Sequence, residues 1–283
     1  MKTYFASKPQ YPLPDIEGSW QYVKYPCACE VKYDGEFDYL VGNGNVAILI
    51  NKYGRVRQDL AITQELKAFT GVLAGELYYA TGKSFYEEML SHKFADELRF
   101  CAFDILQYGE NWVVDEPLHY RRRLLELIEA GRLEHTRIAE QVICKDKPAV
   151  MQFYDKVVAQ GYEGIVVKNL DSRFVNGLCQ SWFKLKRHST ADLFVLGLEK
   201  GKVAIVVGTE AKVPLCSVGN AGRGFLEVYA KVKEQQIIAE DKEYLYVEPK
   251  YVVEVKYQEI LKTGKLRHPV FLREREQGKE VSV

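Results

Sequence analysis

Hydrophobic residues along the first two thirds of the chain fall into short runs of strand length, separated by polar turns. Gly42-Asn43-Gly44-Asn45 lies between two of these runs and predicts a hairpin, because Gly and Asn tolerate the positive φ of tight turns. The predicted strands of this part are Cys27–Tyr33, Phe37–Val41, Val46–Ile50, Val72–Tyr79, Arg99–Leu106, Gly164–Val167 and Trp182–Leu185.

Three further segments show helical spacing of apolar residues. Leu60–Phe69 and Tyr120–Ala130 have an apolar face that recurs at about the helical period. Pro148–Gln160 begins with a proline and ends just before Gly161, which is the usual asymmetry of a helix. Strands and helices in this order predict an α+β domain.

From about Ala191 onward the pattern changes to short strands separated by glycine turns. This spacing is typical of a small β-barrel. We therefore expect two domains, residues 1–189 and 190–283. The strands predicted in the second domain are Leu193–Leu198, Val203–Val207, Phe225–Tyr229 and Val252–Val255.

The composition is that of a folded protein, with 47% hydrophobic and 28% charged residues. Acidic and basic side chains number 39 each, so any binding of nucleic acid must depend on a local basic patch. Arg121-Arg122-Arg123, at the start of a predicted helix, is one candidate, although a merely solvated helix face explains it equally well. Lys184, Lys186, Arg187 and His188 form a second candidate.

The six cysteines include no CxxC pair, so a zinc ribbon is not expected. Cys27 and Cys29 have strand spacing and are interpreted as two buried thiols on one face. The first 25 residues lack a basic start followed by an apolar run, and no stretch approaches the roughly 20 apolar residues of a membrane span. We expect an intracellular, cytoplasmic chain.

The first candidate for chemistry is Lys32, in the segment Glu30-Val31-Lys32-Tyr33-Asp34-Gly35 at the end of a predicted strand. A lysine is a nucleophile only when its amine is uncharged, and an ordinary lysine pKa near 10.4 leaves only about one in 10³ uncharged at neutral pH. Nearby cations, including a metal ion, raise that fraction. Alone, however, a Lys-x-Asp-Gly segment occurs often by chance, and an ordinary turn explains it better than catalysis does.

Five more segments accompany Lys32 in a fixed order. Each has an unremarkable explanation, such as an exposed strand end, a core phenylalanine or the wet face of an amphipathic strand. The segments are Gly75-Glu76-Leu77-Tyr78, Ala102-Phe103-Asp104-Ile105-Leu106, Tyr162-Glu163-Gly164-Ile165-Val166-Val167-Lys168, Ser181-Trp182-Phe183-Lys184-Leu185-Lys186-Arg187 and the tail that runs from Leu266 to Arg275.

Taken together, the order and spacing of these six motifs resemble the superfamily of covalent nucleotidyltransferases, which contains DNA ligases, RNA ligases and mRNA capping enzymes. Within it the chain is most similar to minimal ATP-dependent DNA ligases, from about Cys27 to Lys279. The resemblance implies a nucleotidyltransferase (adenylation) domain of antiparallel sheets with flanking helices, followed by an OB-fold β-barrel. It also implies ATP and Mg²⁺ as cofactors.

The resemblance further implies a role for each matching residue. Lys32 becomes adenylated, Glu30 contacts the adenine base and Phe103 stacks on it. Glu76 binds the ribose and, with Glu163, the metal. The implied phosphate contacts are Lys184 and Lys186 for the α-phosphate, and Arg273, Arg275 and Lys279 for the pyrophosphate leaving group.

By the same resemblance, the reaction is nick sealing in three steps. AMP passes from ATP to Lys32, then to the 5′-phosphate at a nick, and it leaves when the 3′-hydroxyl attacks. The implied partner is nicked duplex DNA, bound by a monomer that acts in DNA replication or repair. Since the implied leaving-group residues lie in the second domain, that domain is expected to close and reopen during the cycle.

The sequence departs from the family pattern at three places. Phe37 stands where DNA ligases and capping enzymes commonly have Arg. Lys52 precedes Tyr53-Gly54 at a position where Arg is frequent, and lysine cannot form the bidentate fork that arginine makes with a phosphate. The last motif, Arg275 to Lys279, is one residue longer than usual. Each departure concerns how phosphates are held.

Three alternatives stay open from the sequence. An RNA ligase of the same superfamily is favoured slightly by Phe37, because RNA ligases also lack the arginine. A capping-type guanylyltransferase fits the Lys-x-Asp-Gly turn, although Trp182-Phe183-Lys184-Leu185-Lys186 is more similar to ligases. A catalytically inactive nucleic-acid-binding protein is disfavoured by the presence of the charged motif residues.

Overall fold

The computed structural model describes residues 11–13, 20–80, 97–128, 133–219, 223–261 and 263–275. The chain divides into two compact units, Met1–Lys186 and Arg187–Val283. Within the described ranges no helix has the length and apolar character needed to cross a membrane.

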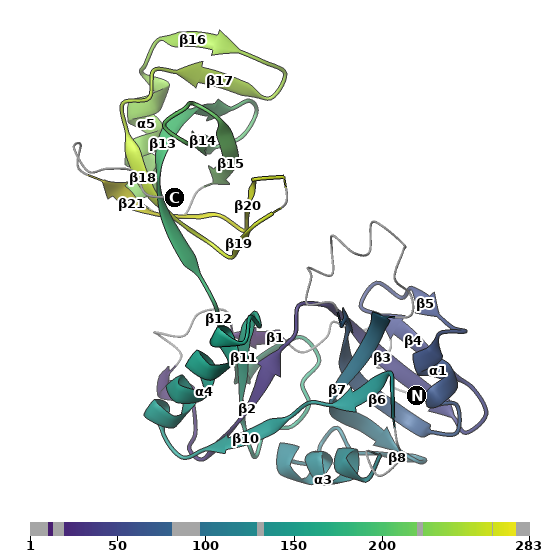
Figure 1. Ribbon diagram of the computed structural model, residues 1–283. Coiled ribbons are helices and arrows are strands. Elements are labelled where there is room, and N and C mark those ends of the chain that lie inside the picture. The colour runs from purple at the N-terminus through teal and green to yellow at the C-terminus, as the bar shows by residue number, and fades with distance from the viewer. Residues whose placement is uncertain are drawn as a thin grey trace. The chain divides into compact units, whose positions relative to one another are not determined.

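The first unit contains two sheets. One has the strand order β1-β12-β11-β2-β10 and is antiparallel except where β1 runs parallel to β12. Helix α4 packs on this sheet (Figure 1), through Val150, Phe153 and Val157 against Cys27, Cys29 and neighbouring apolar residues. The strands are β1 Tyr11–Leu13, β2 Cys27–Lys32, β10 Gln141–Cys144, β11 Gly164–Asn169 and β12 Leu178–Lys186, and α4 is Lys147–Ala159.

The other sheet has the order β5-β4-β3-β6-β7-β8, with β9 added parallel to β7. Helices α1 and α3 pack against it through Ile62 and Leu125. Its strands are β3 Glu36–Asn43, β4 Ala47–Asn51, β5 Val56–Arg57, β6 Thr70–Tyr79, β7 Leu98–Tyr108, β8 Asn111–Trp112 and β9 Thr136–Ile138; the helical segments are η2 Trp20–Tyr22, α1 Ala61–Glu65 and α3 Leu118–Ile128.

The sequence predictions for the first unit hold in outline. The hairpin at residues 42–45 joins β3 to β4, with Gly44 at φ 86°. Asp146 caps α4 by accepting a hydrogen bond from the backbone N–H of Ala149, and Gly161 follows the helix at φ 89°. The predicted helix Leu60–Phe69 is shorter than expected, because α1 ends at Glu65 and a turn follows.

The second unit is an antiparallel sheet covered by one helix (Figure 1), as the OB-type prediction requires. Its strands follow the order β15-β14-β13-β17-β16, with β18 paired to both β13 and β21, and a separate pair β19-β20. The elements are β13 Ser189–Glu199, β14 Ala204–Gly208, β15 Pro214–Gly219, α5 Arg223–Lys233, β16 Ile237–Glu240, β17 Tyr244–Val247, β18 Val252–Tyr257, β19 Glu259–Ile260, β20 Leu266–Arg267 and β21 Val270–Arg275.

Two predictions for this unit are wrong. The predicted strand Phe225–Tyr229 lies inside helix α5, because Phe225, Val228 and Val232 recur at the helical period and are fully buried together. The predicted barrel is not closed: over the described strands no ladder joins β15 to β21, although both border the same core.

A buried ion pair ties α3 to β7 in the first unit. Arg121 is 0% exposed and binds Asp104 with two parallel hydrogen bonds of 2.8 Å, while its remaining donors reach the carbonyls of Glu116 and Ser172. Arg121 is therefore a core residue, and its proposed place in a DNA-binding surface with Arg122 and Arg123 is wrong. Since Asp104 follows Phe103, the pair also fixes β7 next to a predicted site residue.

Removing this arginine leaves a buried carboxylate without its cation. Arg121→Ala is expected to lower the free energy of unfolding by about 3–5 kcal/mol, the usual cost of breaking a buried pair. Arg123→Ala, an exposed neighbour on the same helix, is the control and should change it by less than about 0.5 kcal/mol. Urea titration of both variants measures the difference; equal stabilities would contradict the structural role of Arg121.

Candidate active site

The candidate site is built on β2 and its two antiparallel neighbours. Lys32 is the last residue of β2 and lies opposite Gly164 at the start of β11. On the other side of β11, Gly164 lies opposite Lys186, the last residue of β12. The register thus places two lysines on either side of Gly164, next to Glu163, although the three segments are far apart in sequence.

Glu163 bridges these two lysines. Its Oε2 accepts a hydrogen bond from Lys32, and its Oε1 lies 2.5 Å from the Lys186 Nζ. Burial works to raise the pKa of Glu163, but the positive charges of Lys32 and Lys186 outweigh it and hold the pKa below its usual range. The carboxylate is therefore ionised in the folded protein and holds the ends of β2 and β12 together.

Gly164 is required by this geometry. Its φ is +147°, a conformation that side-chain-bearing residues rarely adopt, and a Cβ there would collide with the carbonyl oxygen of Leu185 on β12. The Glu-Gly motif is thus explained by the close approach of two strands. The glycine leaves room for the backbone of β12, and the glutamate before it forms ion pairs with both lysines.

Glu76, on β6, joins the site from the second sheet. The backbone N–H of Gly35 donates to its carboxylate, and a Cβ on Gly35 would lie 2.7 Å from the Glu76 Cγ. This close approach explains the glycine of the Lys-x-Asp-Gly motif. Burial is the main cause that raises the pKa of Glu76 to about 7, with Lys32 opposing and Glu163 reinforcing the shift.

The charge of Lys32 reflects a balance of opposing effects. Burial of its ammonium acts to lower the pKa, but the carboxylates of Glu163, Glu76 and Asp34 act in the opposite direction, and the net pKa is raised. The Lys184 pKa is lowered, first by burial and then by the charges of Lys186 and Lys32. Three lysines and two glutamates therefore lie close enough to influence one another's protonation.

Phe103 and Glu30 lie beside this charged group and share one partner, Lys168. The Lys168 ammonium, 1% exposed, donates to Glu30 and to the Phe103 carbonyl, and lies 4.8 Å and 4.0 Å from the ring centroids of Phe103 and Trp182. The other Glu30 oxygen accepts from Gln141 at 2.8 Å. Glu30 is 2% exposed with both oxygens engaged, so a direct contact with a base requires one partner to give way.

Lys168 is a site residue for which sequence reasoning assigned no role. The available signal was a lysine within the apolar strand run of residues 165–168, where a charge is costly unless it is paired. Its partner Glu30 is 138 positions earlier in the chain, so the pairing depends on the β2–β11 register.

Phe37, which occupies the position of an expected arginine, belongs to an aromatic group. Its ring centroid lies 4.8 Å from that of Tyr39 and 6.0 Å from that of Phe103. Lys52 lies exposed in the turn between β4 and β5, with its ammonium 5.0 Å from the Tyr53 ring. Over the described part of the chain, Lys52 forms no ion pair with the glutamates of the site.

The predicted leaving-group residues belong to the second unit. The Arg273 side chain, 62% exposed, donates from Nε to Glu254 at 2.6 Å. Arg275 binds Asp192 at 2.8 Å and Glu254 at 3.3 Å. Lys279 lies outside the described residues. Both described arginines of β21 are thus held by acidic side chains, Glu254 of β18 and, for Arg275, also Asp192 of β13.

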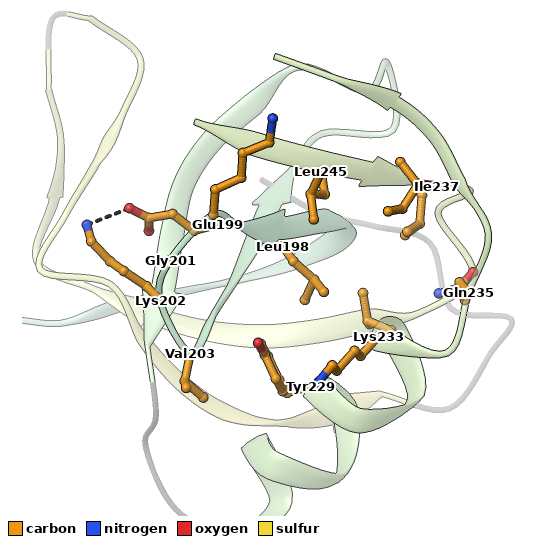
Figure 2. Close-up of a pocket in the computed structure, with 13 residues that line it drawn as sticks. Leu198, Glu199, Gly201, Lys202, Val203, Tyr229, Lys233, Gln235, Ile237 and Leu245 are labelled. Atoms are coloured by element: carbon orange, nitrogen blue, oxygen red, sulfur yellow. Dashed lines mark hydrogen bonds and ion pairs between the residues drawn. The ribbon is translucent and has the colours of Figure 1, made fainter. Parts of the chain in front are cut away.

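A separate hollow of about 520 Å³ lies in the second unit (Figure 2). Its wall combines the β13–β14 turn, where Lys202 pairs with Glu199 at 2.5 Å, with Tyr229 and Lys233 of α5 and Leu245 of β17. None of the residues that the sequence predicts to act in the site lines this hollow.

The metal prediction rests on two carboxylates. No group of three or more His, Cys, Asp or Glu side chains suitable for a metal ion is found in the ranges that the structure describes. Glu76 and Glu163 alone still fit Mg²⁺, which usually binds one or two carboxylates together with waters and substrate phosphates.

Comparison with known proteins shows the family of this chain. The ATP dependent DNA ligase domain matches residues 13–186, and the ATP dependent DNA ligase C terminal region matches residues 199–278. A DNA ligase from Thermococcus onnurineus is 30% identical over 285 residues, covering 87% of this chain and 50% of the relative. The chain spans about half the length of the curated relatives it matches.

Solved structures agree on the fold. A structure from a study of DNA binding with a minimal scaffold by Lig E DNA ligases has a TM-score of 0.67 at 20% identity and covers 94% of this chain and 99% of its own. A mycobacterial DNA ligase D complexed with ATP has a TM-score of 0.56 at 22% identity, with 100% and 99% covered.

The first family match covers more than half of the chain, and the chain therefore belongs to the ATP-dependent DNA ligase family.

Proposed function

We propose that this chain seals nicks between a 5′-phosphate and a 3′-hydroxyl in duplex DNA, using ATP and a lysyl-AMP intermediate on Lys32. The observation that carries the proposal is the meeting of Lys32, Glu163 and Lys186 at the ends of three adjacent strands, with Lys184 and Glu76 close by. An amine in this position can attack a phosphate, while the neighbouring lysines offset the charge of the phosphate and the carboxylates can bind a metal cation.

In the first step, the Lys32 amine attacks the α-phosphorus of ATP. A P–N bond forms, the bond between the α-phosphorus and the bridging oxygen breaks, and pyrophosphate leaves. Lys184 and Lys186 offset the charge that develops on the α-phosphate, and Phe103 stacks on the adenine. Arg273, Arg275 and Lys279, which belong to the second unit, orient the pyrophosphate.

The amine must lose a proton before it attacks. Burial already favours the neutral form of Lys32, and the surrounding carboxylates oppose it. Neutralising those carboxylates therefore lowers the Lys32 pKa and releases the nucleophile. Glu76 and Glu163 would hold Mg²⁺, which supplies positive charge next to the phosphates when it is bound.

In the later steps, AMP passes from Lys32 to the 5′-phosphate of the nick, restoring the free amine. The 3′-hydroxyl then attacks the 5′-phosphorus, a phosphodiester bond forms and AMP leaves. Lys32 is needed only to form and transfer the adenylate, so the last step does not require its amine. This separation provides a test of the assignment.

The function is tested by incubating the purified chain with ATP, Mg²⁺ and a 5′-phosphorylated nick, in all-DNA and RNA-containing duplexes side by side. We expect sealing of the all-DNA nick. Lys32→Ala should lose at least about 10³-fold in sealing, because the nucleophile is gone, yet still seal a nick that already carries AMP. Sealing confined to RNA-containing nicks would instead indicate an RNA ligase, and covalent labelling by GTP a capping-type enzyme.

The role of Arg273 predicts a step-specific defect. Arg273→Ala should slow formation of lysyl-AMP by roughly 10²-fold, the usual cost of losing one charge that stabilises a transition state. Sealing of a pre-adenylated nick should change by less than about threefold, because no pyrophosphate leaves in that step. Arg267→Ala, which removes an arginine paired with Glu259 in the same unit, is the control. An equal loss in both steps would show that Arg273 does not act on the leaving group.

A further inference from the structure

A cluster of three tyrosines includes Tyr33, the residue that follows the candidate nucleophile Lys32. The ring centroid of Tyr33 is 4.5 Å from that of Tyr78 and 5.6 Å from that of Tyr162, the second contact being edge-to-face at 78°. Both separations are within the range of favourable aromatic pairs. The tyrosine cluster, defined as Tyr33, Tyr78 and Tyr162, is one contiguous group.

Each member of the tyrosine cluster is next to a charged residue of the site. Tyr33 directly follows Lys32, and Tyr162 directly precedes Glu163. Tyr78 is two residues after Glu76 on β6, so the two side chains share one face of that strand. The three rings therefore join the backbone segments that carry the nucleophile and both carboxylates.

Tyr33 is the member on which the arrangement depends most. The ladder of β2 with β11 ends at Lys32, and β3 begins only at Glu36, so Tyr33 lies on the connection between them. Its ring, half-buried between the other two tyrosines, anchors the chain at the point where β-sheet pairing stops. Burial is the main cause that raises the Tyr33 pKa to about 12, so the hydroxyl remains neutral.

Arg137 contacts two members of the tyrosine cluster. This exposed residue of β9 donates a side-chain hydrogen bond to the Tyr33 hydroxyl, and its guanidinium lies 5.8 Å from the Tyr78 ring centroid. Within the described residues, the buried Tyr78 hydroxyl has no hydrogen-bond partner. The contribution of Tyr78 to the cluster is thus its ring and not its hydroxyl.

We propose that Tyr33 is a positioning residue: its ring, held between Tyr78 and Tyr162, fixes the end of β2 so that the Lys32 amine stays aimed at the reacting phosphate. The inference rests on the proposed function of Lys32. It assigns Tyr33 no contact with ATP. Because displacement of a reacting group by about 1 Å can cost on the order of 10²-fold in rate, a ring that holds the nucleophile's backbone has a measurable effect.

The experiment measures covalent AMP formation by the full chain in single-turnover time courses at increasing ATP concentration. Tyr33→Ala should lower the maximal rate by roughly 10²-fold while changing the ATP concentration at half-maximal rate by less than about threefold. Tyr33→Phe keeps the ring and should restore the maximal rate to within about threefold of the original protein. Tyr33→Leu keeps apolar bulk without the flat ring and replaces the alanine variant if that variant does not fold. Its maximal rate should fall between those of Tyr33→Ala and Tyr33→Phe.

Phe69→Ala is the matched control for a general loss of packing. Phe69 contacts Gly42 and Gly71 at the far end of the β3–β6 ladder from Glu76, so its removal weakens the same sheet away from the site. It should lower the thermal midpoint as Tyr33→Ala does, with less than about a threefold effect on the maximal rate.

Three results would overturn the inference. They are an unchanged maximal rate in a folded Tyr33→Ala or Tyr33→Leu variant, an equal loss in Phe69→Ala, or a defect confined to the ATP concentration dependence, which would mean that Tyr33 binds the nucleotide. If the unsubstituted chain itself formed no covalent AMP, the proposed function would fail as well. If the unsubstituted chain formed covalent AMP and Tyr33→Ala did so at the same maximal rate, only the positioning role of Tyr33 would be rejected.

Discussion

The candidate site depends on the two ion pairs that the Glu163 carboxylate forms, one with Lys32 and one with Lys186. It depends on Gly164, where a side chain would collide with the Leu185 carbonyl of β12, and on the pairing of β11 with both β2 and β12. The negative charge of this carboxylate offsets the repulsion between the two lysine ammonium groups in a partly buried setting. The same carboxylate also contributes to the raised Lys32 pKa, so in the proposed mechanism it opposes loss of the amine's proton until another cation binds.

Buried ion pairs and aromatic rings surround Glu163 and the two lysines and connect the strands that carry the site. Lys168 connects Glu30 to the rings of Phe103 and Trp182, and the Arg121–Asp104 pair fixes β7 from the other side. Buried charges of this kind are costly unless every donor and acceptor is engaged, and here the described partners engage them. These pairs connect the strands that carry Glu30, Phe103 and Asp104. The arginines of β21 are prepared separately in the second unit, where Glu254 and Asp192 orient them.

The short segments that contain Lys32, Glu163 and Lys186 could be selected from sequence, because each is a local motif at or beside a strand end. The hairpin at residues 42–45 and the capped helix α4 follow from local signals that tertiary contacts do not override. The strand predicted at Phe225–Tyr229 was wrong because a short apolar run fits either period, and only burial of Val232 with it reveals the helix. The burial of Arg121 and the pairing of Lys168 with Glu30 depend on partners distant in sequence, which no local pattern contains.

We propose that Lys32 is the residue that carries AMP. The chain is incubated with ATP and Mg²⁺ in the absence of DNA and digested at neutral to alkaline pH, where the phosphoramidate bond survives. Peptide mass spectrometry then locates the added AMP. We expect a single adduct on the peptide that contains Lys32, with Lys184 and Lys186 unmodified. An adduct on either of those lysines, or the absence of any covalent AMP, would contradict it.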